Sequence, residues 1–419
     1  MSSAAASSAA ASSAAASSAA GRDPSYRWVV LGAGVLAQAA VAAVLQGLPG
    51  LAPQLREEFG LGLTGLGVLL ASVTLGLVSM LVLWGVAADH YGERRVMTAG
   101  LLLAVVALLG ATHTTTVGAL MAWLVLAGAA GASVNAASGR AVLGWFGPQQ
   151  RGFAMGVRQT ALPLGAGLAA AVLPPVASAH GLDAAFRLLA AGCLAGAVVV
   201  ALLVREAPRQ PQKVHGGLAP VRDARIRRLG AVSMLLVVPQ FAVVAFLVVY
   251  LVDEHGVSVG AAALLLAAVQ FGGGTGRIVA GHWSDRLGLR IVPLRRVALA
   301  VTALFALLAL LESTGVPAAV PVLLLAGVVA ISWNGLAFTA VGELAGPGRA
   351  GTALGLQNTA VALGAALTAP LLGAVVDRSS WGVGFALAGC FALVAVLLLR
   401  GPAGGERPHH VPPVDTAID

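Results

Sequence analysis

Two arginines fall inside long apolar stretches of the sequence, where a charge is costly. Arg277 precedes Asp285 by eight residues, so on a helix it lies about 12 Å inward from that carboxylate. Arg158 follows Arg151 by seven residues, which places it at most about 10 Å along its own helix. A guanidinium is a planar fork of donors that suits a carboxylate or another oxyanion. Both arginines are therefore candidates for binding an anion, since a charge at membrane depth marks a functional site by default.

Each arginine also has a structural interpretation. A long basic side chain can extend to the lipid headgroups and keep its charge in water. This alternative suits Arg140 best, because it lies near the end of its stretch, and there we expect a headgroup contact. The same headgroup interpretation stays open for Arg158. It also stays open for Arg277, although that side chain would have farther to extend.

Acidic residues are missing from the middle of every apolar stretch. Glu343 and Glu312 lie close to stretch ends, and the other nearby acids lie at loop edges. A carrier that exchanges a cationic drug for protons usually needs a carboxylate within the membrane. Two buried cations without a buried anion instead favour an anionic substrate, which would supply the missing countercharge.

Twelve apolar stretches must position these residues. Of the 419 residues, 58% are hydrophobic and 10% are charged, and the mean hydropathy is +0.90. A soluble domain carries about 25% charged residues, so this composition excludes a soluble fold. A membrane helix needs roughly 20 apolar residues. The stretches that meet this length begin near Trp28, Leu66, Val96, Val117, Phe153, Ala184, Leu229, Ala261, Val297, Ala318, Gly351 and Val383.

The basic residues orient the chain in the membrane. If the N-terminus is cytoplasmic, only Arg56, Arg187 and Arg378 among the 25 Lys and Arg residues fall outside, while Arg158 and Arg277 lie within stretches. All the others are then on the cytoplasmic side, as the positive-inside bias requires. We predict a multi-pass protein of the cytoplasmic (inner) membrane with both termini in the cytoplasm. The net charge of +8 is thus a topology signal and not a nucleic-acid footprint.

The two halves of the chain repeat each other. The pattern of Gly85, Asp89 and Gly92 recurs as Gly281, Asp285 and Gly288, which is an offset of 196 residues. Three further pairs share an offset of 199 residues. These pairs are Thr160 with Thr359, Gly165 with Gly364, and Asn135 with Asn334. Two six-helix repeats imply a central site between them near the midplane, reached by alternating access.

The motif Gly85, Asp89, Gly92, Arg94 and Arg95 resembles the loop 2–3 signature of the major facilitator superfamily, apart from His90, where an Arg is common. A degenerate copy follows the eighth stretch at Gly281, Asp285, Arg286 and Gly288. The resemblance implies an all-α integral membrane protein with twelve transmembrane helices in two pseudo-symmetric six-helix bundles. It also implies that Asp89 faces the start of helix 11 near Gly351, where the helix dipole favours a carboxylate. We expect both motifs to form conformational latches.

The resemblance also suggests where the substrate binds. Helices 5 and 8 pack together across the two halves in this superfamily, so Arg158 and Arg277 are expected to face one cavity. Helices 1, 4, 7 and 10 line that cavity, and each carries neutral polar residues. The candidate lining residues are Gln38, Asn135, Gln240, Trp333 and Asn334. Taken singly, each of them also fits a role as interhelical hydrogen-bonding glue.

Finer motifs narrow the branch of the superfamily. The run from Arg151 to Gly165 is similar to helix 5 of the cyanate and nitroimidazole branch. Gly276, Arg277 and Gly281 are similar to the helix 8 arginine region of oxalate and monocarboxylate carriers. The drug-exporter motif of helix 5 is not met, because Leu162 and not Gly precedes Pro163.

We therefore predict a secondary transporter for a small organic or inorganic anion, working by symport or anion exchange. The alternatives are a proton-coupled exporter of a drug or metabolite, and a non-transporting receptor or scaffold. No enzyme activity, metal or cofactor is expected, protons are a possible second partner, and the protein is expected to be a monomer. The predicted parts are a disordered Ala/Ser-rich tail, a six-helix bundle, a cytoplasmic linker, a second bundle and a cytoplasmic tail. They span 1–26, 27–204, 205–228, 229–400 and 401–419.

Overall fold

The structure is a computed structural model that describes residues 25–400 except 62, 207–218, 315–318 and 347. Its described part contains twelve helical spans long and apolar enough to cross a membrane, as the sequence predicts. Each span begins within six residues of its predicted start. Residues 1–24 of the predicted N-terminal tail, the predicted C-terminal tail and half of the predicted linker (207–218) lie outside the described residues. A short helix, α10 (Ala219–Arg222), lies in the described part of that linker.

The first six spans form one bundle. Their helices are α2 (Tyr26–Gly47) with α3 (Ala52–Phe59), α4 (Leu63–Tyr91), α5 (Glu93–Ala111), α6 (Val117–Trp145), α7 (Arg151–Gln159) with α8 (Ala161–His180), and α9 (Leu182–Leu203).

The last six spans form the second bundle. Their helices are α11 (Ala224–Asp253), α12 (Val259–Leu287), α13 (Ile291–Thr314), α14 (Ala319–Ile331) with α15 (Asn334–Ala345), α16 (Ala350–Arg378) and α17 (Trp381–Leu398). Each bundle has its own buried apolar core.

Two spans are broken into two helices each. The fifth divides into α7 and α8 at Thr160, and the tenth divides into α14 and α15 at Ser332 and Trp333. A helix break leaves backbone carbonyls without an intrahelical donor, and such groups need other partners in a membrane. Both breaks therefore create polar positions inside an otherwise apolar protein.

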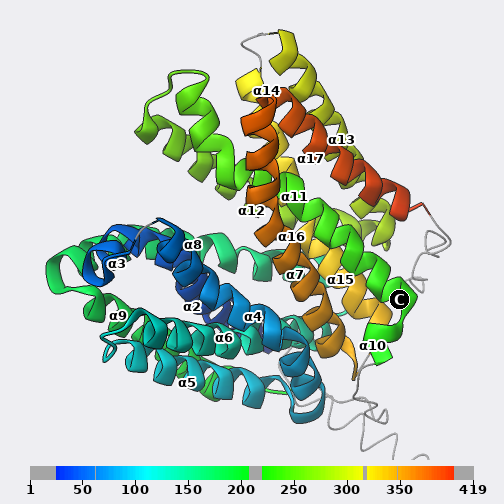
Figure 1. The fold of residues 1–419 in the computed structure, drawn as a ribbon. Helices are drawn as coiled ribbons and strands as arrows, with labels where there is room; N and C mark the ends of the chain where they lie inside the picture. The colour runs from blue at the N-terminus through cyan, green and yellow to red at the C-terminus, as the bar shows by residue number, and fades with distance from the viewer. Residues whose placement is uncertain (1–24, 62, 207–218, 315–318, 347, 401–419) are drawn as a thin grey trace, which may run out of the picture.

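The two bundles meet mainly at one end of the molecule. Packing between them is concentrated where α4 meets α16 and where α7 meets α12. By contrast, α12 has few contacts with α8, the second half of the same span. Figure 1 shows the two groups of helices meeting near α7, α15 and α16 and diverging away from this junction. We call the packed end, where Asp89 and Asp285 lie, the closed end.

Candidate functional site

Arg158 lies in the first bundle, surrounded by neutral acceptors. It is 1% exposed, which rules out a headgroup contact in this conformation. Its Nε donates to Ser138 Oγ at 2.8 Å, and its Nη2 donates to the Asn135 carbonyl at 2.7 Å and to Gln38 Oε1 at 3.3 Å. Its Nη1 donates to Gln159 Oε1 at 3.0 Å. None of these partners neutralises its charge.

Arg277 belongs to the second bundle and reaches both helix breaks. It is 4% exposed. Its Nε donates to the carbonyl of Ile331, the last residue of α14, at 2.9 Å. Its Nη1 donates to the carbonyl of Gln159, the last residue of α7, at 2.6 Å. The bond to Gln159 joins the two bundles, and again both acceptors are neutral.

The predicted lining residues form one matching pair in each bundle. Gln38 Nε2 donates to Asn135 Oδ1 at 2.7 Å between α2 and α6. Asn334 Nδ2 donates to Gln240 Oε1 at 3.0 Å between α15 and α11. All four side chains are buried. These pairs join neighbouring helices, as hydrogen-bonding glue would, and they also place polar atoms beside the arginines.

Several buried polar atoms have no hydrogen-bond partner among the described residues. Two are donors that belong to predicted site residues, Asn135 Nδ2 and Trp333 Nε1. The hydroxyl of Ser133 and the Oε1 acceptor of Gln357 are also without a partner. A buried polar group without a partner costs free energy, so native proteins seldom keep one without a reason.

Asp89 joins the bundles at the closed end. It accepts hydrogen bonds from Gly351 N at 2.9 Å, Thr352 N at 2.9 Å and Thr352 Oγ1 at 2.8 Å. These donors form the first turn of α16, where no side chain of the same helix caps the N-terminus. The carboxylate therefore caps a helix of the opposite bundle and interacts favourably with its dipole. This contact is the one that the resemblance implies, and its role as a latch stays a prediction.

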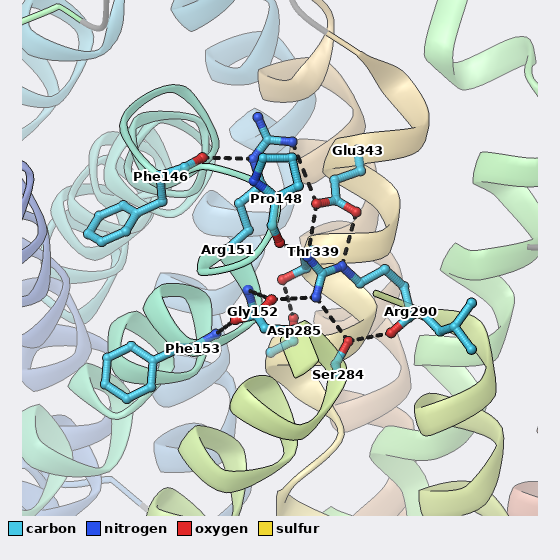
Figure 2. A network of polar contacts seen from close by, with 12 residues as sticks. Phe146, Pro148, Arg151, Gly152, Phe153, Ser284, Asp285, Arg290, Thr339 and Glu343 are labelled. Carbon is cyan, nitrogen blue, oxygen red and sulfur yellow. Dashed lines mark hydrogen bonds and ion pairs between the residues drawn. The ribbon is translucent and has the colours of Figure 1, made fainter. Parts of the chain in front are cut away.

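Asp285 makes the equivalent contact in the other direction. It accepts hydrogen bonds from Gly152 N at 2.9 Å and Phe153 N at 2.8 Å, in the first turn of α7. Figure 2 shows this carboxylate among the polar groups gathered at the start of α7. The two contacts follow the internal repeat: the end of α4 caps α16, and the end of α12 caps α7.

Arg290 is the cation that pairs with Asp285 at the closed end. It binds Asp285 Oδ1 at 2.5 Å and Glu343 Oε2 at 3.0 Å, and its Nη2 donates to the Pro148 carbonyl (Figure 2). Burial acts to lower the pKa of the guanidinium, but the hydrogen bonds and charges of Glu343 and Asp285 raise it above its ordinary value. Arg290 therefore stays charged, and Arg151 adds a second cation at 3.5 Å from Glu343.

Arg140 is the cation that pairs with Asp89 at the closed end. The sequence instead favours a headgroup contact for this residue. Its Nε lies 3.3 Å from Asp89 Oδ1, and its Nη1 binds Glu93. That expectation is wrong because two buried carboxylates lie within reach of the side chain. Conversely, three arginines of the predicted latch motifs, Arg94, Arg95 and Arg286, are exposed.

Glu93 is a buried carboxylate that the sequence analysis missed. It is 1% exposed, its Oε1 has no hydrogen-bond partner, and it lies against the carboxylate of Glu206. Glu206 also accepts a hydrogen bond from the backbone N–H of Arg94 at 3.3 Å. Glu93 directly follows Gly92 of the motif, so the sequence alone suggests a loop residue. In the structure it is the first residue of α5, and there it is buried.

The comparisons with known proteins agree with the fold. Residues 34–369 match the family model described as "Major Facilitator Superfamily". The chain is 37% identical over 385 residues to an uncharacterized MFS-type transporter of Mycobacterium tuberculosis, covering 90% of this chain and 86% of that protein.

More distant relatives include proteins whose names give a substrate. The chain is 26% identical to the hexuronate transporter of Bacillus subtilis over 86% of this chain and 92% of that one. It is 25% identical to a probable sulfoacetate transporter of Cupriavidus necator, with 83% and 86% covered. Among solved structures, a proton:xylose symporter superposes with a TM-score of 0.73 at 18% identity, covering 90% and 96%, which supports the fold alone.

Proposed function

The chain belongs to the major facilitator superfamily, and from that premise we propose that this multi-pass secondary transporter carries a small anion with one or more acceptor oxygens. Members of this family are transporters and not enzymes. The proposal concerns the substrate, the residues that bind it and the orientation of the protein.

The two buried guanidiniums carry this proposal. Arg158 and Arg277 are almost fully buried, and each of their hydrogen bonds among the described residues goes to a neutral acceptor. Leaving two cations in a membrane without countercharge is costly. A bound anion would offset this cost by supplying the missing negative charge.

The named relatives support the same substrate class. Hexuronate is a carboxylate and sulfoacetate is a sulfonate with a carboxylate, and both relatives cover most of this chain. These substrates belong to the relatives. They guide the choice of probes for this protein without defining its substrate.

The latches support transport by alternating access. Asp89 and Asp285 each cap a helix of the opposite bundle, so the bundles are held together at the closed end. With the predicted orientation, in which both termini are cytoplasmic, the closed end faces the cytoplasm. We propose that rocking of the bundles breaks both contacts and opens the site to the cytoplasm.

Uptake into proteoliposomes tests the proposal. Purified protein would face labelled cyanate, nitrate, formate, lactate, oxalate, glucuronate and sulfoacetate, with a pH gradient set in either direction. We expect saturable uptake of at least one anion. The pH dependence of that uptake would separate proton symport from anion exchange.

Arg277→Ala is the first variant to compare. Removing the guanidinium deprives the anion of one of its two charged donors, so uptake should fall by about tenfold or more. Arg378→Ala is the control, because Arg378 is an exposed arginine outside both the proposed site and the latch motifs. Normal uptake by Arg277→Ala, in protein that elutes as a single species, would contradict the proposal.

A proton-coupled exporter is the second candidate, and Glu93 is the observation that favours it. The sequence offers no buried carboxylate for proton exchange, whereas the structure places one against Glu206. Absence of anion uptake together with drug resistance on overexpression would favour this candidate.

A further inference from the structure

Gln159 contacts both buried arginines. Its side-chain Oε1 accepts from Arg158 Nη1 at 3.0 Å, within the first bundle. Its backbone carbonyl accepts from Arg277 Nη1 at 2.6 Å, across to the second bundle. The residue is 3% exposed. One neutral residue thus supplies an oxygen to each of the two cations.

The carbonyl of Gln159 is available for a chemical reason. In a continuous helix this oxygen would accept from the backbone N–H four residues later, which is position 163. That residue is Pro163, which has no N–H to donate. The chain breaks between α7 and α8 at Thr160, where the backbone N–H bonds to Val157 O instead. Arg277 therefore takes the place of the missing helical donor.

We propose that Gln159 determines substrate specificity by occupying the two arginines until the substrate displaces it. The proposal rests on the proposed anion-transport function. Its two oxygens bind the guanidiniums in the empty protein, and the incoming anion must compete with both. Because the oxygens are neutral, an anionic oxygen forms the stronger hydrogen bonds and can replace them.

This arrangement defines the class of substrate more closely. To replace the contacts of Gln159, the anion must offer an acceptor oxygen to each arginine. A carboxylate or sulfonate meets this requirement, and a halide does not. Displacement would also remove the Arg277 contact between the bundles, so binding would loosen the bundles near the middle of the membrane.

Two substitutions at Gln159 separate competition from simple packing. Gln159→Glu keeps the shape of the side chain but supplies a permanent negative charge to the arginines. It should raise the Kd for an anion by about tenfold or more, the scale of one hydrogen bond to a charged group. Gln159→Met keeps the volume but removes the competing side-chain oxygen, so the Kd should stay the same or fall.

Pro163→Ala tests the backbone half of the proposal independently. Alanine restores an N–H that can bond to the carbonyl of Gln159, which would release Arg277 for the anion. We expect the Kd to fall, opposite to the change in Gln159→Glu. This variant also keeps the proposal testable if Gln159→Glu does not fold.

The measurement is binding of glucuronate and sulfoacetate to purified full-length protein, by calorimetry and by thermal shift. The proposal is supported if Gln159→Glu weakens binding, Gln159→Met does not, and Pro163→Ala tightens it. Equal weakening by Gln159→Glu and Gln159→Met, or unchanged affinity in Gln159→Glu, overturns it. Failure of the wild-type protein to bind either anion or any anion of the uptake panel would instead reject the proposed function.

Discussion

At the scale of single residues, Arg140 lies between two buried carboxylates. Its guanidinium binds Asp89 and Glu93, which are both about as buried as core residues. A buried ion pair adds little net stability, but removing one partner leaves a buried charge uncompensated. Substitution of Arg140 should therefore lower the stability of the fold as well as the rate of transport.

We predict that Arg140→Gln lowers the free energy of unfolding by about 3–5 kcal/mol, because Glu93 and Asp89 lose their common cation. The measurement is the midpoint of thermal unfolding in detergent. Arg94→Gln is the control, since Arg94 belongs to the same motif but is exposed. Adding Glu93→Gln to Arg140→Gln should restore part of the loss. An unfolding midpoint equal to that of the control would contradict the prediction.

At the scale of the elements, close contact between α7 and α12 depends on glycine. A Cβ built on Gly281 would lie 2.1 Å from the Gly152 carbonyl oxygen, and one on Gly152 would lie 2.5 Å from the Gly281 oxygen. Backbone atoms cannot move aside as a side chain can. The two helices can therefore pack at this distance only while both positions lack a side chain.

Gly281→Ala should consequently separate α7 from α12 and weaken the closed end. We would measure chemical cross-linking between Phe153→Cys and His282→Cys, whose rings lie 6.3 Å apart in the native protein. The background is Cys193→Ala and Cys390→Ala, which removes both native cysteines. Most of the cross-linking should be lost.

Gly32→Ala is the control, because no atom lies within 4 Å of a Cβ at that position. Equal yields of cross-linked protein in Gly281→Ala and Gly32→Ala would contradict the prediction.

At the scale of the whole molecule, the two bundles are held at the closed end by the two helix caps. Asp89 accepts three hydrogen bonds from α16, and Asp285 accepts two from α7. A hydrogen bond to a charged group typically contributes about 1.5–3 kcal/mol to stability. Conformations of a transporter differ by only a few kcal/mol, so the caps can decide which end is closed.

We predict that Asp89→Asn combined with Asp285→Asn shifts the population toward a form that is open at this end. Spin labels on Arg95→Cys and Arg286→Cys, two exposed positions on opposite bundles, would report a longer distance. The cysteine-free background described above applies here too. Asp183→Asn, an exposed carboxylate far along the chain, serves as the control. An unchanged distance distribution in the double variant would show that the carboxylates do not hold the bundles.

How much of the protein the sequence determines differs between these scales. Apolar length sets the number of spans, because a segment of about 20 apolar residues has few alternatives to crossing the membrane. The twelve spans and their two groups of six follow from local composition and from the repeat, and the motif from Gly85 to Arg95 indicates the family by resemblance. The sequence also predicts the depth of Arg158 and Arg277, since a helix converts sequence distance into length.

The partners of the charged residues could not be predicted in the same way. Arg140 and Arg290, and not the motif arginines Arg94 and Arg286, pair with the carboxylates at the closed end. Glu93 is buried although the sequence places it beside a loop. Each of these outcomes depends on which helices meet at the closed end.

Gln159 shows the same division within one residue. The sequence by itself determines that its carbonyl has no helical donor, because Pro163 follows four residues later. Only the tertiary structure brings Arg277, 118 residues away, to that oxygen. Hydropathy and backbone chemistry act along the chain and can be read from it. The pairing of charges depends on distances between helices, and these are decided only when the two bundles pack.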